Sequence, residues 1–193
     1  IKLDGNYPTG TDNVALGDTA LDSVQSGGTN NTTIGNHAGT AITTGDYNTA
    51  LGSLSLESNT TAGNNTAIGG AALRCNTTGC ENTSVGSGSM ASNLTGDNNT
   101  AVGRCALNAN TTADDNTAVG KDAMVANTTG TGNVAVGTYT LDANTEGDSN
   151  TAIGKQALSA NTTADYNTAV GRQALFSNTT GAGNTAVGYE SLK

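Results

Sequence analysis

Residues 99–115 read NTAVGRCALNANTTADD, and residues 116–132, which follow directly, read NTAVGKDAMVANTTGTG. The two 17-residue stretches align without a gap, and both begin with asparagine, threonine, a small residue, an aliphatic residue and glycine. The first step between successive anchor glycines is 18 residues and the other nine are 17. The eleven anchor glycines are Gly17, Gly35, Gly52, Gly69, Gly86, Gly103, Gly120, Gly137, Gly154, Gly171 and Gly188. A fixed period of this length predicts a repeat protein, in which each repeat packs on the next.

The composition excludes several classes of protein. Leu, Ile, Val and Phe together make up 29 of 193 residues, which is few for an ordinary globular core. Seven Lys and Arg against sixteen Asp and Glu argue against binding to a nucleic-acid backbone. No apolar run approaches the roughly 18 residues that a membrane span needs. Because Gly, Asn, Thr and Ala recur in a regular order, the chain is predicted to be an ordered repeat rather than a disordered segment.

The residues before each anchor glycine alternate in character. The position four before it is Asn in all eleven copies, and the position three before it is Thr or Val. The next position is small, and the last one is always aliphatic, as in Val102 and Val119. This alternation predicts a short β-strand whose β-branched and aliphatic side chains share one face, with the small side chain on the other.

A second apolar column lies four residues after the anchor glycine, and the turn sequence NTTG or NTTA follows it. Seventeen residues therefore hold two short strands and two turns, too few for a βαβ unit or a helical repeat. We predict an all-β fold, a parallel β-solenoid of about eleven 17-residue coils stacked at ~4.8 Å, with residues 1–193 forming one repeat domain within a longer fibre. The residues expected to form structural ladders between coils are Asn48, Asn65, Asn99, Asn116, Asn150, Asn167, Gly52, Gly69, Gly103, Gly120, Gly154 and Gly171.

The interior of so short a coil is narrow, and one apolar column is enough to fill it. The second apolar column, which includes Met90 and Met124 besides leucines, would then lie along the outside of the rod. A continuous exposed apolar stripe predicts a partner surface, and parallel copies of the chain bury it in every coil. The leucines expected to contact neighbouring chains are Leu73, Leu107, Leu141, Leu158 and Leu175. The periodicity leaves the number of chains open, and we expect three.

The motif NTAVG resembles the SVAIG motif of YadA-type head repeats in trimeric autotransporter adhesins. The longer unit, with AL and NTTG added, is similar to repeats in phage tail fibres and related virion or cell-surface fibres. The resemblance covers the chain from Asn13 to Leu192. It implies a left-handed parallel β-roll, a homotrimer and a role in attachment to a surface. This coil is longer than the adhesin repeat, so the resemblance does not say where the leucine column lies.

Residues that could carry chemistry are few, and we predict no catalytic, cofactor-binding or metal site. His37 is the only histidine and is expected in a surface turn. An acidic turn column could in principle bind Ca²⁺, but several coils lack the acidic residue, so we interpret it as solvated. This column contains Asp46, Asp97, Asp114, Asp148 and Asp165.

A basic column directly follows the anchor glycine in four coils and contains Arg104, Lys121, Lys155 and Arg172, with Thr138 in the coil between the two pairs. It could meet an anionic glycan, but we favour a role in offsetting nearby acidic turns and opposing lateral aggregation.

Cysteines and glycosylation sequons are given no chemical role. Cys75 and Cys80 flank one turn and could bridge it, whereas Cys105 lies in another phase of the repeat, and we predict no disulfide. Sequons such as those at Asn59, Asn76, Asn110 and Asn161 are interpreted as turn and ladder residues rather than glycan carriers.

The sequence therefore predicts a non-enzymatic, trimeric fibre shaft of a virion tail fibre or a cell-surface adhesin. The chain is expected to bind copies of itself, with any glycan or receptor bound by parts outside it, and to bind neither nucleic acid nor the interior of a membrane. One alternative is a subunit of a self-assembling extracellular filament, whose open strand edges recruit further strands. A minor alternative is an ice-binding solenoid, but threonines do not stand two apart on one face, since the strand partner of Thr49 is Leu51.

Overall fold

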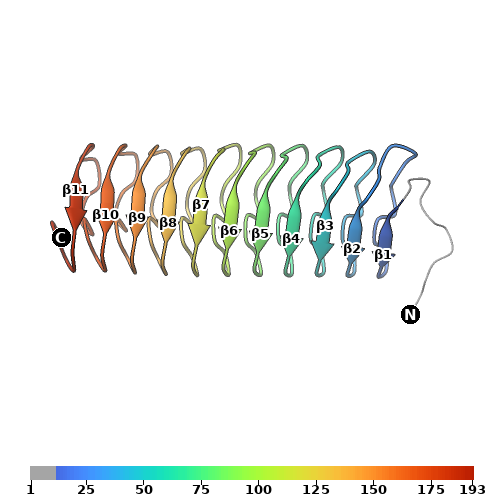
Figure 1. The fold of residues 1–193 in the computed structure, drawn as a ribbon, viewed down its shortest axis with the longest axis horizontal. Helices are drawn as coiled ribbons and strands as arrows, with labels where there is room; N and C mark the ends of the chain where they lie inside the picture. The colour runs from blue at the N-terminus through green and yellow to red at the C-terminus, as the bar shows by residue number, and fades with distance from the viewer. Residues whose placement is uncertain (1–11) are drawn as a thin grey trace.

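The computed structural model describes residues 12–193, and the first eleven residues of the predicted domain lie outside this range. Eleven three-residue strands form one parallel sheet in sequential order, and each strand from β2 to β10 pairs with the strands before and after it (Figure 1). The strands are β1 (Val14–Leu16), β2 (Thr32–Ile34), β3 (Thr49–Leu51), β4 (Thr66–Ile68), β5 (Thr83–Val85), β6 (Thr100–Val102), β7 (Thr117–Val119), β8 (Val134–Val136), β9 (Thr151–Ile153), β10 (Thr168–Val170) and β11 (Thr185–Val187). The predicted all-β, parallel β-solenoid is confirmed.

Each coil places its residues in line with those of the next. Between β6 and β7, for example, Ala101 lies opposite Ala118, and Val102 lies opposite Val119. The same register holds at every strand pair from β1 to β11, so the columns of the sequence become columns in space. Parallel strands need a long connection between them, which is usually a helix. Here the remainder of each coil serves as that connection, so successive strands can lie parallel without a helix.

The second strand that the sequence predicted in each coil is absent from residues 12–193, where each coil holds one strand. The segment around the second apolar column is a turn with φ of 62° at Leu54 and 49° at Leu56. The backbone N–H of Leu54 donates to the Asn36 carbonyl of the preceding coil (2.9 Å), whereas that of Leu56 donates to the Ala72 carbonyl of the next coil (3.1 Å). A turn that bonds in both directions therefore replaces the expected strand.

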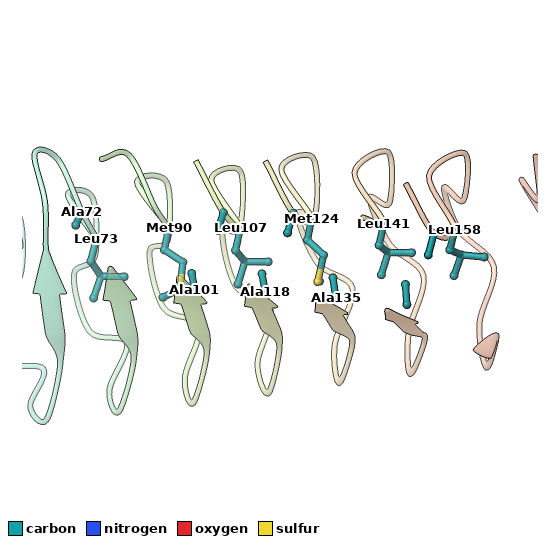
Figure 2. Packing of buried hydrophobic residues seen from close by; sticks show 14 of the residues in the cluster. Ala72, Leu73, Met90, Ala101, Leu107, Ala118, Met124, Ala135, Leu141 and Leu158 are labelled. Carbon is teal, nitrogen blue, oxygen red and sulfur yellow. The ribbon is translucent and has the colours of Figure 1, made fainter. Parts of the chain in front are cut away.

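The interior of the coil contains the alanine column of the strands and the leucine and methionine column of the turns (Figure 2). Leu107 and Ala118, for example, are both fully buried. The prediction that the leucines face other chains is wrong, because a single chain already buries them to within 4% exposure. These buried leucines are Leu73, Leu107, Leu141, Leu158 and Leu175. The physical reason is volume, since an alanine on one wall leaves room for a long side chain from the opposite wall.

The outer face of the sheet carries the other two strand columns. Because side chains alternate along a strand, an inward alanine places both of its neighbours outward. Val102, Ile153 and Leu51 are accordingly 37%, 40% and 44% exposed. The aliphatic column that the sequence placed inside the coil is therefore outside, beside the threonine column. We call these two columns, over β1 to β11, the outer sheet face.

The anchor glycine is required by both its conformation and its surroundings. Gly103 has a φ of 140°, and a Cβ built on it would lie 2.4 Å from the carbonyl oxygen of Gly120 in the next coil. An L-residue tolerates neither the conformation nor the contact with backbone. The stack of glycines therefore sets how closely successive coils approach at this corner.

The arrangement of the core predicts which of two neighbouring apolar residues stabilises the chain. Leu107→Ala removes a buried side chain and should lower the free energy of unfolding by about 2–5 kcal/mol. Val102→Ala acts on the outer sheet face and should cost less than about 1 kcal/mol in the isolated chain. Urea unfolding of the two variants at low protein concentration measures both. Equal losses would contradict the assignment of Leu107 to the interior.

The turn position with positive φ that lies two residues before each strand predicts a stabilising substitution. Tyr166 has a φ of 59° and is 69% exposed, so its backbone is strained without compensating burial. Asparagine tolerates the left-handed region, and Asn64 and Asn98 occupy the equivalent position in other coils. Tyr166→Asn should therefore raise the free energy of unfolding by up to about 1 kcal/mol. Gly132→Tyr, which places tyrosine at the same position of another coil, should lower it. A Tyr166→Asn variant that melts below the wild type, or a Gly132→Tyr variant that melts above it, would contradict this prediction.

Candidate functional site

Buried asparagines join the coils along one line. The backbone N–H of Asn116 donates to Oδ1 of Asn99 (3.0 Å), and Nδ2 of Asn116 donates to the Gly130 carbonyl (2.9 Å). The same bonds recur down the column, so each side chain satisfies groups in two coils. The ladder asparagines expected from the sequence are all at most 1% exposed: Asn48, Asn65, Asn99, Asn116, Asn150 and Asn167. The six ladder glycines stack as described for Gly103.

A second asparagine ladder lies in the NTTG turns. Nδ2 of Asn110 donates to Oδ1 of Asn93 in the preceding coil (2.7 Å) and to the Ala113 carbonyl in its own turn (3.0 Å). The Ala113 carbonyl also accepts from Asn99, so it joins the two ladders. The signal for this second ladder was present in the sequence, because the asparagine recurs with the same 17-residue period.

This second ladder explains the sequons. The asparagines of the four sequons named above are fully buried, and the nitrogen that would carry a glycan is the one that donates in the ladder. In the folded coil these nitrogens are not accessible for glycosylation.

Removing one ladder side chain should therefore cost stability. Asn110→Ala deletes two donated hydrogen bonds and leaves the buried Oδ1 of Asn93 without its donor, whereas the Ala113 carbonyl keeps its bond from Asn99, and the variant should lower the free energy of unfolding by about 2–4 kcal/mol. Asn36 is exposed, and Asn36→Ala is the matched control, with an expected change within about 0.5 kcal/mol. Circular dichroism melts compare the two, and a neutral Asn110→Ala would contradict the role of the ladder.

The acidic column is part of the backbone network rather than freely solvated. Oδ1 of Asp114 accepts the backbone N–H of Asp97 (2.7 Å), and Oδ1 of Asp165 accepts that of Asp148 (2.7 Å). Asp46 accepts the N–H of Thr29 in the same way (2.6 Å). Within residues 12–193, no group of three or more His, Cys, Asp or Glu side chains is arranged to hold a metal ion. The column therefore caps one corner of each coil.

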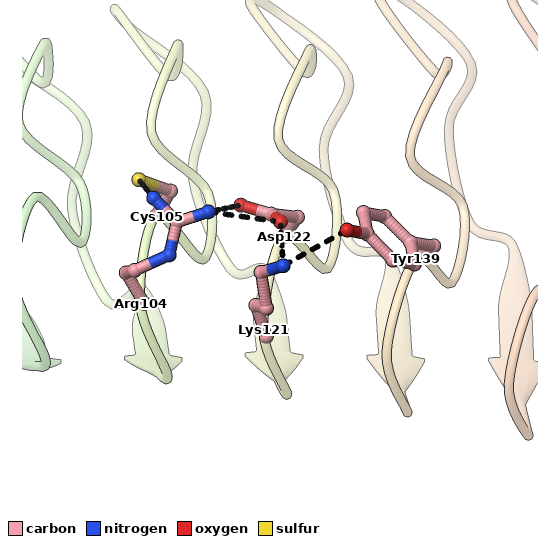
Figure 3. Close-up of polar contacts among 5 residues, drawn as sticks. All are labelled: Arg104, Cys105, Lys121, Asp122 and Tyr139. Atoms are coloured by element: carbon pink, nitrogen blue, oxygen red, sulfur yellow. Dashed lines mark hydrogen bonds and ion pairs between the residues drawn. The ribbon is translucent and has the colours of Figure 1, made fainter.

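The basic column lies at the opposite end of the strands, and its first two members share a small polar cluster (Figure 3). Asp122 accepts ion pairs from Arg104 (3.3 Å) and Lys121 (3.5 Å). Lys121 also donates to the Tyr139 hydroxyl at 2.9 Å, and this hydrogen bond is the main cause that raises the pKa of the Lys121 ammonium. Both cations remain about half exposed, so the cluster leaves positive charge at the surface.

The other two cations of the column form no salt bridge in the described part of the chain. Lys155 is exposed, and Arg172 lies over the ring of Tyr189 at 5.5 Å. Thr138 lies between the two pairs of cations, in the coil of β8. The column is thus a line of exposed positive charge on a chain whose net charge is −9.

The remaining candidates for chemistry are isolated. His37 is partly buried in a left-handed turn, with φ of 56°, and its backbone N–H donates to the Asp18 carbonyl. Cys75, Cys80 and Cys105 are free thiols and are partly buried. Burial raises the pKa of the Asp142 carboxyl, although Ser159 donates to it.

Comparisons with protein-family models, with curated proteins and with solved structures found no match to this chain. Among residues 12–193 there is no helix with the length and apolar character of a membrane span. The surface with the most regular chemistry is the outer sheet face, with the acidic column at one of its long edges and the basic column at the other. We treat this surface as the candidate functional site.

Proposed function

We propose that this chain is a non-enzymatic fibre shaft, in which three parallel copies associate through their outer sheet faces. The observation that carries the proposal is that face itself, which repeats a threonine and an aliphatic side chain in nearly every coil. A contiguous apolar surface of this length on an isolated rod is unusual and typical of an interaction surface. A closed ring of identical chains covers it in every coil at once.

A shaft of a virion tail fibre or a cell-surface adhesin fits this architecture better than a catalyst does. The buried asparagine side chains form hydrogen-bonded ladders between coils. Such a stack is stiff because each coil is bonded to both neighbours. In this role the shaft supports attachment by holding a recognition element at a distance from the virion or cell surface. The resemblance of NTAVG to adhesin head repeats supports the same role.

Two further functions remain as alternatives to this proposal. A self-assembling extracellular filament would use the same coil with end-to-end growth, and electron microscopy of the natural source distinguishes short fibres on particles from long free filaments. An ice-binding surface would use the same face, but the aliphatic column occupies the place where a second threonine column would be required. A thermal-hysteresis assay measures that activity directly.

Placing charge on the outer sheet face tests the proposal. The double variant Val102→Lys and Val119→Lys should dissociate the assembly into folded single chains, because an apolar seam cannot accept unpaired ammonium groups. Ala109→Lys and Ala126→Lys, which lie directly before the NTTA and NTTG turns and not on the outer sheet face, are the matched control and should leave assembly unchanged. Sedimentation velocity gives the mass, and circular dichroism verifies the fold. A wild-type chain that sediments as a monomer would refute the proposed association.

A further inference from the structure

Four of the five aspartates in the acidic column share a coil with a cation of the basic column, whereas Asp46, in the coil of β3, does not. Reading along the chain, Asp97 precedes β6 and Arg104 follows it, and Asp114 and Lys121 flank β7 in the same way. The coils of β9 and β10 repeat this arrangement with Asp148 and Lys155, and with Asp165 and Arg172. Between them, the coil of β8 carries Thr131 and Thr138, and so lacks both charges.

The two columns do not neutralise each other within the chain. Among residues 12–193 no ion pair joins an aspartate of the acidic column to a cation of the basic column. Each of the four aspartates uses Oδ1 for a backbone N–H of the preceding coil, which leaves the second oxygen of the carboxylate available. The three-residue strand separates the two columns, so that they lie at opposite long edges of the outer sheet face.

We propose that these two charged edges orient the association, so that the outer sheet face binds a second copy of this chain parallel to itself and in coil-for-coil register. This inference rests on the proposed shaft and adds the geometry of its interface. In any ring of parallel chains that face a common axis, the acidic edge of one chain meets the basic edge of its neighbour. An antiparallel pair instead brings acidic edge to acidic edge and basic edge to basic edge, which is repulsive.

The uncharged coil of β8 fixes the register. With no offset, all four charged coils pair across each interface, and the two threonines of β8 meet each other. A slip of one coil keeps only two of the four pairs, because the gap in one edge then faces a charge on the other. In one direction of slip, for example, Asp114 would meet Arg104 and Asp165 would meet Lys155. An interface built only from apolar columns would lack this distinction, since every coil presents the same side chains.

Charge reversal on the basic edge tests the inference without touching the backbone bonds of the aspartates. The double variant Lys155→Glu and Arg172→Glu should raise the dissociation constant of the assembly by about tenfold or more at low salt, and by less at high salt. Adding Asp148→Asn and Asp165→Asn should restore part of the loss, because asparagine keeps the Oδ1 acceptor and removes the repulsion. The control variant with Ala109, Ala126, Ala143 and Ala160 replaced by Glu also moves the net charge from −9 to −13. It should dissociate far less.

The direction of the chains is measured separately by electron–electron distances between spin labels. The labels are placed at Ser58→Cys or Ser177→Cys after Cys75, Cys80 and Cys105 are replaced by Ser. The two sites lie seven coils apart, or ~34 Å along the rod. Parallel association predicts that labels at the same site on neighbouring chains are closer than labels at different sites in a mixed sample, and an antiparallel arrangement predicts the reverse.

The outcomes separate this inference from the proposed shaft. A monomeric wild type refutes the shaft assembly and this inference together. An assembled wild type whose dissociation is no more sensitive to the Lys155 and Arg172 reversals than to the alanine control refutes the role of the charged edges alone. Closer distances between different label sites refute the parallel direction. Charge-specific dissociation with closer same-site labels supports the inference.

Discussion

Hydrogen bonds between successive coils are the constraint on which the rest of this structure depends. Each coil can stack only if its polar groups meet partners at the same height in the next coil, and the asparagine columns provide those partners in the interior. A buried amide without partners is costly, so a change in one coil affects both of its neighbours. This requirement explains why the asparagine before each strand is invariant over eleven repeats while the exposed positions vary.

The ladders also determine which side chains lie inside. With asparagine at two corners, the interior holds the strand alanines, one leucine or methionine column and the alanines that precede that column in five coils, so side chains of small total volume fill it. The low content of large apolar residues is thus sufficient for a core in this fold. The remaining threonine and aliphatic columns are directed outward, where they form a regular face without a partner in a single chain. The strand alternation that turns alanine into the core therefore also creates the outer surface proposed for association.

The sequence was sufficient to predict the solenoid, its 17-residue coil and the strand at each NTAVG motif, because strict periodicity and alternation define them without long-range information. It was insufficient to predict whether each column of side chains faces the interior of the coil or the solvent. Alternation groups Thr100 with Val102 opposite Ala101, but it does not say which group faces inward. That choice depends on the turn, where residues such as Leu107 adopt positive φ and direct their side chains back into the coil. Positive φ at leucine has no propensity signal, so the sequence pattern predicts a strand where the turn lies and an outward position for the leucine column.

The most direct test of the account is the solvent exposure of two methyl groups in the same chain. Paramagnetic relaxation of methyl resonances by a soluble probe reports the exposure of Leu107 and Val119 under identical conditions. Leu107 is expected to be protected at every protein concentration, whereas Val119, which is partly exposed on the single chain, should become protected as the chains associate. A Val119 methyl that stays exposed in the assembled state, or a Leu107 methyl that is exposed in the dilute state, would contradict the account.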